Sequence, residues 1–197
     1  MKTIGICGKI GSGKSAVGVL LAERGMLVLD LDCEMHLLYA ESERLRDKIA
    51  ERFGADCIRN GTVDRAALAG RVFRELRSLS ELEGIVYPLL QKTVEGKLAA
   101  AAKLSPPPRL AAVEGALLFK WPEFSKSLEE IWVVEAPEAI RLSRLEGRGL
   151  SREDALRRIQ VQAQDPLPPN DRYEAIDNSG SMDALKTRVD ELLASKF

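Results

Sequence analysis

The feature that most constrains this chain is a glycine-rich octapeptide near its N-terminus, Gly8-Lys9-Ile10-Gly11-Ser12-Gly13-Lys14-Ser15. It matches the pattern G-x-x-x-x-G-K-[S/T]. Glycines let the backbone turn tightly, so that successive N–H groups point inward around an anion. Lys14 is placed to reach the β- and γ-phosphates of a nucleotide, and the Ser15 hydroxyl to ligate Mg²⁺. We therefore expect the phosphates of ATP to be held by Gly8, Ile10, Gly11, Ser12, Gly13, Lys14, Ser15 and Ala16.

The residues on either side of this loop predict a β-α-β unit. Residues 3–7 are short, apolar and bounded by glycine, which is typical of a buried parallel strand. Residues 15–24 carry apolar side chains at helical spacing, and Gly25 is suited to close that helix. Residues 27–31 predict a second strand that ends at Asp32, beside the first strand and parallel to it.

The segment 33–103 has a helical pattern throughout, with three apolar stripes and no strand signal. We interpret it as a helical insertion that follows the second strand. Pro88 lies inside the third stripe, where it is expected to kink the helix or to start a new one, because it removes a backbone hydrogen bond.

The remainder of the chain predicts strands at 110–113, 131–134 and 175–177 and helices at 137–146, 151–164 and 182–193. The fold class is therefore α/β, a doubly wound five-stranded parallel sheet. We expect one domain over 1–197, with its core at about 1–32, 104–146 and 173–197. A helical lobe at 33–103 and a lid at about 147–172 complete it.

Three carboxylates at expected strand ends are candidates for chemistry. In doubly wound sheets, ligands bind at the carboxyl ends of the strands. Asp32 could accept a proton from an attacking hydroxyl, whereas Asp30 is as well explained by capping or solubility. Glu114 could hold a water on Mg²⁺. Arg144 and Arg148 lie four residues apart on one helix face, which suits binding of phosphate.

The composition limits the classes of partner. Of 197 residues, 45% are apolar, and a formal net charge of −1 argues against a general field for nucleic acid. No apolar run is long enough to span a bilayer. The odd, widely spaced set Cys7, Cys33 and Cys57 argues against a disulfide framework and against zinc, so we expect a cytoplasmic protein. We expect a monomer or a small homo-oligomer.

Several further segments, in this order and spacing, resemble the dephospho-CoA kinase family. They are Asp30-Leu31-Asp32 with His36; Gly61 to Arg65 with Leu68 and Val72-Phe73; Leu117 to Phe119; Arg144 and Arg148 with Ser151, Arg158 and Gln162; and Ile176 to Gly180.

The resemblance implies ATP- and Mg²⁺-dependent phosphorylation of the ribose 3′-hydroxyl of dephospho-CoA. Asp32 would be the general base, and Lys14 and Arg144 would stabilise charge. The helical lobe would bind the acceptor, with Asn178 near the adenine of ATP. By the same resemblance, the residues expected to contact the acceptor are Asp32, His36, Arg65, Tyr87 and Leu117. Besides the loop, the nucleotide would be contacted by Arg144, Arg148 and Asn178. The metal ion would be held by Ser15 and, through a water molecule, by Glu114.

The chain departs from the family pattern at several positions, including Pro168, Pro169 and Arg172 between Gln162 and Ile176. Tyr87 precedes Pro88 where the family has histidine, Ala116 stands where proline is usual, and Lys120 stands where an acid is common. These departures keep two alternatives open: another small-molecule P-loop kinase, or a degenerate ATP-binding regulator. The absence of an Asn-Lys-x-Asp motif makes a GTPase the least favoured reading.

Overall fold

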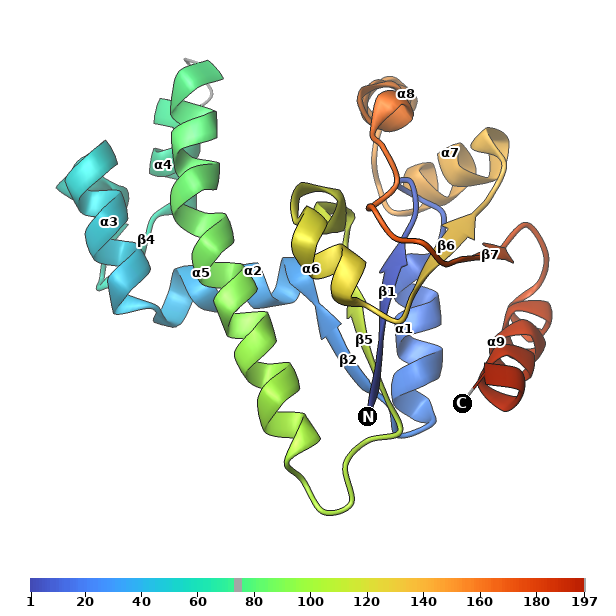
Figure 1. Cartoon of the computed structure of the whole chain (residues 1–197). Helices are drawn as coiled ribbons and strands as arrows, with labels where there is room; N and C mark the ends of the chain where they lie inside the picture. The colour runs from blue at the N-terminus through green and yellow to red at the C-terminus, as the bar shows by residue number, and fades with distance from the viewer. Residues whose placement is uncertain (73–75, 197) are drawn as a thin grey trace. The chain divides into compact units, whose positions relative to one another are not determined.

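The computed structural model describes residues 1–72 and 76–196 (Figure 1). The chain divides into two compact units. The core unit comprises residues 1–30 and the chain from Ala101 on, and the helical unit comprises Leu31–Ala100.

The core unit is built on a five-stranded sheet whose strand order is β2-β5-β1-β6-β7. All its pairings are parallel, which confirms the predicted fold class. Its strands are β1 (Lys2–Cys7), β2 (Leu27–Asp30), β5 (Leu110–Glu114), β6 (Glu130–Glu135) and β7 (Tyr173–Asp177).

One expectation about this sheet is wrong, because β2 does not lie beside β1. Strand β5 is inserted between them and pairs with both, so that Glu114 stands opposite Ile6 on one side and Asp30 on the other. Every residue of β5 is buried, and its small apolar side chains, Ala111 and Ala112 among them, suit a central strand covered on both faces.

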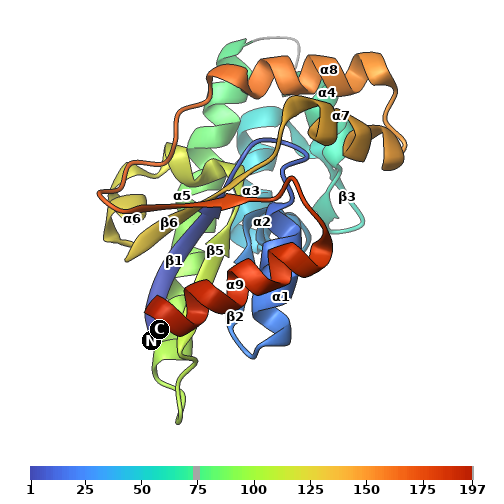
Figure 2. The same ribbon diagram turned by 90° about the vertical axis from the view of Figure 1, so that its right-hand side faces the viewer.

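Helices cover the sheet and connect its strands. They are α1 (Lys14–Glu23), the 3₁₀ turn η2 (Ala116–Lys120), α6 (Pro122–Ser127), α7 (Glu138–Gly147), α8 (Arg152–Val161), the 3₁₀ turn η3 (Gln162–Gln164) and α9 (Met182–Lys196). Figure 2 shows α9 beside α1, and Val17, Leu21, Leu185 and Val189 of these two helices pack with Ile4, Ile6, Trp132 and Ile176 of the sheet. A second cluster joins Leu142 and Leu145 of α7 to Ala155 and Ile159 of α8.

The helical unit contains α2 (Leu31–Glu41), α3 (Glu43–Phe53), the 3₁₀ turn η1 (Ala55–Cys57), β3 (Ile58–Arg59), β4 (Thr62–Val63), α4 (Arg65–Val72) and α5, which starts at Leu76 and ends at Ala102. The second core strand was expected to run on to Asp32. Instead β2 ends at Asp30, and Asp32 lies in the first turn of α2.

The expectation that this insertion contains no strand is also wrong, because β3 and β4 pair as a short antiparallel hairpin. Its turn places Asn60 at φ 51° and Gly61 at φ 74°, the left-handed values that a two-residue hairpin turn requires. Asp64 then caps α4, its Oδ1 accepting from the N–H groups of Ala66 and Ala67 at 3.1 and 3.0 Å. The Gly61-to-Arg65 segment is thus a turn and a helix cap; Phe73, further along it, lies outside the described residues.

Helix α5 continues through Pro88, so of the two outcomes expected at this residue, a kink or a new helix, the second does not occur. An ion pair joins α5 to α2: Lys97 Nζ lies 2.7 and 2.6 Å from the two carboxylate oxygens of buried Glu34. Among the described helices, none combines the length and apolar character needed to cross a membrane.

Candidate active site

The phosphate loop connects the end of β1 to the start of α1, as predicted, and its conformation depends on glycine. Gly8 has φ 150°, and a Cβ there would lie 2.3 Å from the carbonyl oxygen of Val134. Gly13 has φ 100°, and a Cβ there would lie 2.0 Å from Asn178 Nδ2. Val134 O is a backbone atom, and the Asn178 amide is buried and donates to Ser12 O, so a larger residue than glycine at either position would strain the loop.

Ser15 and Glu114 meet where the loop passes the end of β5. Ser15 Oγ donates a hydrogen bond to Glu114 Oε1 at 3.0 Å, and Glu114 is only 5% exposed. Gly18 of α1 makes room for the carboxylate, since a Cβ there would lie 3.2 Å from Glu114 Oε2. A hydroxyl and a carboxylate are hard oxygen donors, so this pair fits a magnesium ion, directly or through water.

Arg144 and Asn178 both bind the backbone of the loop. Arg144 Nη1 donates to the carbonyl oxygens of Gly11 and Ser12 at 3.3 and 3.1 Å, and Nη2 donates to Asn178 O at 2.8 Å. Asn178 is buried, and its Nδ2 donates to Ser12 O at 2.7 Å. Arg148, by contrast, is the exposed C-cap residue of α7. The structure therefore brings Arg144 and Asn178 to the loop and leaves Arg148 at the helix end.

The segment after α8 also contacts the loop. Ile10 N–H donates to Gln162 Oε1 at 2.7 Å, and Lys9 Nζ donates to Ala163 O at 3.2 Å. Gln162 belongs to a segment that resembles the family, but the sequence gives no sign that it binds a loop amide. These contacts join the expected lid to the expected nucleotide site.

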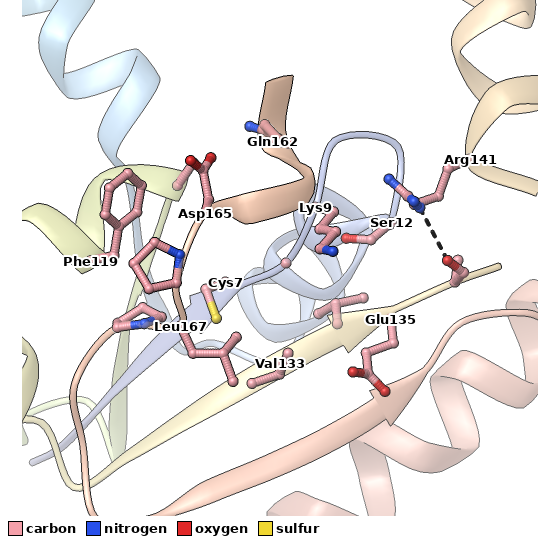
Figure 3. A pocket seen from close by; sticks show the side chains of 16 residues that line it. Cys7, Lys9, Ser12, Phe119, Val133, Glu135, Arg141, Gln162, Asp165 and Leu167 are labelled. Carbon is pink, nitrogen blue, oxygen red and sulfur yellow. Dashed lines mark hydrogen bonds between the residues drawn. The ribbon is translucent and has the colours of Figure 1, made fainter. Parts of the chain in front are cut away.

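A cavity of about 330 Å³ lies against the same loop (Figure 3). Its walls come from the first loop residues, the end of β6, helix α7, η2 and the segment after η3; they include Gly8, Lys9, Ser12, Phe119, Glu135, Arg141, Gln162, Asp165 and Leu167. Cys7 also lines it, and burial raises the pKa of its thiol to about 12 although Lys14 acts in the opposite direction. The thiol is therefore protonated at neutral pH.

Arg141 is a residue that sequence reasoning missed. It lies on α7, is 7% exposed, and donates from Nε to Ala136 O and from Nη1 to Ile10 O. Its position one helical turn before Arg144 was the available signal, but burial could not be read from the sequence.

The remaining expected residues fall in several places. Leu117 is half-buried in η2 of the core unit. Asp32 and His36 are exposed on α2 of the helical unit. In that unit the guanidinium carbon of Arg65 lies 6.0 Å from the centroid of the Tyr39 ring.

Tyr87 has a hydrogen-bond partner on its own helix. Its hydroxyl donates to Glu83 Oε1 at 2.8 Å, and burial, followed by this contact with Glu83, raises the pKa of the phenol. Tyr87 is therefore a neutral donor at physiological pH.

The parallel sheet, the glycine loop between β1 and α1, and the Ser15–Glu114 pair at its edge define a kinase of the P-loop class. The family model described as dephospho-CoA kinase matches residues 2–183. The chain belongs to the dephospho-CoA kinase family, which confirms the resemblance seen in the sequence.

Individual relatives agree with this assignment. The chain is 35% identical to a dephospho-CoA kinase of Frankia casuarinae over 98% of this chain and 82% of the relative. It is 33% identical to one of Latilactobacillus sakei, over 96% and 93% of the two chains. The chain is 30% identical in sequence to the protein in a crystal structure from Thermus thermophilus. The two structures superpose with a TM-score of 0.74 over 100% of this chain and 98% of the other. The structure of a Campylobacter jejuni dephospho-CoA kinase, at 20% identity and TM-score 0.64 over 98% and 96%, shares the fold.

Proposed function

We propose that this protein transfers the terminal phosphate of ATP to the ribose 3′-hydroxyl of dephospho-CoA, giving coenzyme A and ADP. The observation that carries the proposal is the family match over residues 2–183, which spans both the phosphate loop and the helical unit.

The loop and its neighbours hold the phosphates of ATP. Backbone N–H groups and the N-terminus of α1 offer donors and a positive dipole end to the polyphosphate. Lys14 and Arg144 stabilise the negative charge that spreads over the transferred group. Asn178, bound to the loop at Ser12, lies near the adenine, and Arg148 supplies a further cation from the end of α7.

Ser15 and Glu114 hold Mg²⁺, Glu114 through a water molecule. A magnesium ion held there would supply positive charge that offsets the charge of the phosphates. Glu114 contributes a buried carboxylate that accepts a hydrogen bond from the Ser15 hydroxyl, so two oxygen donors lie side by side.

The helical unit binds the acceptor. Asp32, in the first turn of α2, accepts the proton of the attacking hydroxyl. His36, Arg65 and Tyr87 of this unit contact the acceptor, as does Leu117 of the core. The reaction takes place in the cytoplasm, where the three cysteines, none of which forms a disulfide, remain reduced. The protein acts as a monomer or a small homo-oligomer.

The test is to incubate the protein with Mg-ATP, with and without dephospho-CoA, and to follow ADP and CoA together by chromatography. We expect equal amounts of both products, formed only when dephospho-CoA is present. Asp32→Asn should lower turnover by about a thousandfold or more while sparing the affinity for ATP, because it removes the base and leaves the phosphate loop intact. Asp47→Asn, an exposed carboxylate on α3 of the same unit, is the matched control.

Two outcomes would contradict parts of the proposal. ATP binding without any acceptor-dependent ADP would favour a regulator or a different acceptor, and other small hydroxyl compounds would then be screened. CoA formation at the wild-type rate by Asp32→Asn would remove the general-base role and leave the overall reaction in place.

A further inference from the structure

Ile10 of the phosphate loop lies at the corner of a tight turn. Ser12 N–H donates to Lys9 O at 3.0 Å, which closes a β-turn over residues 9–12. Gly11, the third residue of this turn, has φ 79°, a left-handed value that suits a type II turn. The hydrogen bond of the turn uses the carbonyl of its first residue and the N–H of its last. The N–H and carbonyl groups of Ile10 are therefore left for partners outside the turn.

Ile10 is held at three points by the segment that contains α7, α8 and η3. Its N–H donates to Gln162 Oε1 at 2.7 Å, and its carbonyl oxygen accepts from Arg141 Nη1 at 3.4 Å. Its half-buried side chain packs against the apolar cluster that joins α7 to α8. One residue of the phosphate loop therefore contacts this segment through its N–H, its carbonyl and its side chain.

Helix α8 buries few of its own residues, so these contacts matter for its position. Its two buried residues, Ala155 and Ile159, belong to the cluster against which Ile10 packs. Figure 2 shows α7 and α8 side by side, and Gln162 follows directly after α8. Displacing α8 would break the hydrogen bond from Ile10 to Gln162 and uncover the Ile10 side chain. The loop and α8 thus share one set of contacts.

We propose that Gln162 is a positioning residue, which couples the position of α8 to the conformation of the phosphate loop through the N–H group of Ile10. The inference rests on the proposed binding of nucleotide by this loop. The N–H groups after Ile10 surround a phosphate only in one conformation of the loop, and Gln162 holds the turn that leads into it. Nucleotide in the loop then stabilises the docked position of α8. Docked α8 raises the affinity for nucleotide by the same factor, because coupling between two sites is reciprocal.

Hydrogen exchange of the whole protein measures this coupling. Exchange over residues 152–161 of α8 is followed by mass spectrometry, first without nucleotide and then with saturating ADP and Mg²⁺. The quantity compared is the ratio of the two exchange rates. Gln162→Met keeps the length of the side chain and removes the acceptor of the Ile10 N–H. Gln164→Met changes an exposed amide in the same 3₁₀ turn and is the matched control.

In the wild type we expect ADP to slow the exchange of α8 by about fivefold or more, which is the lower end of typical coupling between two sites. In Gln162→Met this ratio should fall by about fivefold, because one hydrogen bond contributes roughly that factor. Gln164→Met should keep the wild-type ratio. If Gln162 only stabilised the structure, its loss would speed exchange equally with and without ADP. A ratio unchanged in Gln162→Met would therefore overturn the coupling.

Ile10→Ala keeps the test decisive if Gln162→Met lowers the melting temperature. It removes the side chain that packs against the α7–α8 cluster and leaves the N–H group in place, and it should also reduce the ratio. Calorimetric titration with ADP separates two kinds of failure. A wild-type protein that binds ADP without any slowing of α8 exchange would contradict the coupling alone. A wild-type protein that does not bind ADP would contradict the proposed nucleotide site, and the coupling with it.

Discussion

Ser15 of the phosphate loop donates a hydrogen bond to Glu114 at the end of β5, at 3.0 Å and across 99 positions of sequence. Glu114 is buried between the strand ends that carry Ile6 and Asp30. The parallel pairing of β5 with its neighbours thus places the Glu114 carboxylate against the Ser15 hydroxyl in the first turn of α1. Both oxygen-bearing side chains therefore lie at the same edge of the sheet.

Replacing Glu114 by Gln should lower turnover about 10- to 100-fold, because an outer-shell partner of a metal site typically contributes that factor. The amide keeps the shape and loses the charge, so the loss should shrink as Mg²⁺ is raised. Turnover against Mg²⁺ concentration is the measurement, with Glu123→Gln on the exposed face of α6 as control. An unchanged Mg²⁺ dependence would remove Glu114 from the metal site.

Gly8→Ala should abolish nucleotide binding. The new Cβ would lie 2.3 Å from Val134 O, a backbone atom, and φ of 150° is a conformation that alanine rarely adopts. Gly147→Ala is the control, since a Cβ there meets nothing within 4 Å, and it should keep its affinity for ATP. Calorimetric titration with ATP distinguishes the two, and normal binding by Gly8→Ala would mean that the loop can move away from β6.

Asp64→Ala should reduce stability most above the carboxyl's ordinary pKa. Hydrogen bonds from the N–H groups of α4, that of Ala67 foremost, lower the pKa of Asp64 from its ordinary value of 3.8. Because the pKa of Asp64 is lower in the folded protein, its ionised carboxylate stabilises the fold at pH values above 3.8. This stabilisation is lost as the pH falls through the pKa of the folded protein. The melting temperatures of wild type and variant should therefore converge on acidification. A constant difference between them at all pH values would exclude this linkage, and Asp47→Ala gives the baseline for an exposed carboxylate.

Cysteine labelling should distinguish one thiol from the other two. Cys33 is exposed, whereas Cys7 and Cys57 are buried, and burial raises the pKa of both buried thiols. Since the thiolate is the reactive form, only Cys33 should react quickly with iodoacetamide in the native protein. Mass spectrometry of labelled peptides tests this prediction, with denatured protein as the reference for full labelling.

The protonated Cys7 thiol also affects how stability depends on pH. It contributes stability below its ordinary pKa of 9.0, and this contribution is lost as the pH rises toward the folded-state pKa of about 12.

At Asp32 the sequence indicates the role of the residue but not its local structure. Its role as base is predicted from the order of motifs, but its local structure was misjudged, because an apolar run ending in two acids reads as a strand. In the fold β2 stops at Asp30 and the next residue already begins α2. The β3–β4 hairpin was missed for a related reason: two-residue strands carry too few side chains to establish a periodicity.

The sequence by itself determined the phosphate loop, since glycines, Lys14 and Ser15 act within eight consecutive residues, and also the parallel α/β class. It also determined the family, because the motifs keep their order and spacing along the chain although single residues such as Tyr87 differ from the family pattern. Only the tertiary structure decided that β5 separates β1 from β2, that Arg141 is buried, and that Gln162 binds the amide of Ile10. These facts depend on contacts between segments far apart in the chain, and no local pattern encodes which of many apolar or polar partners will meet.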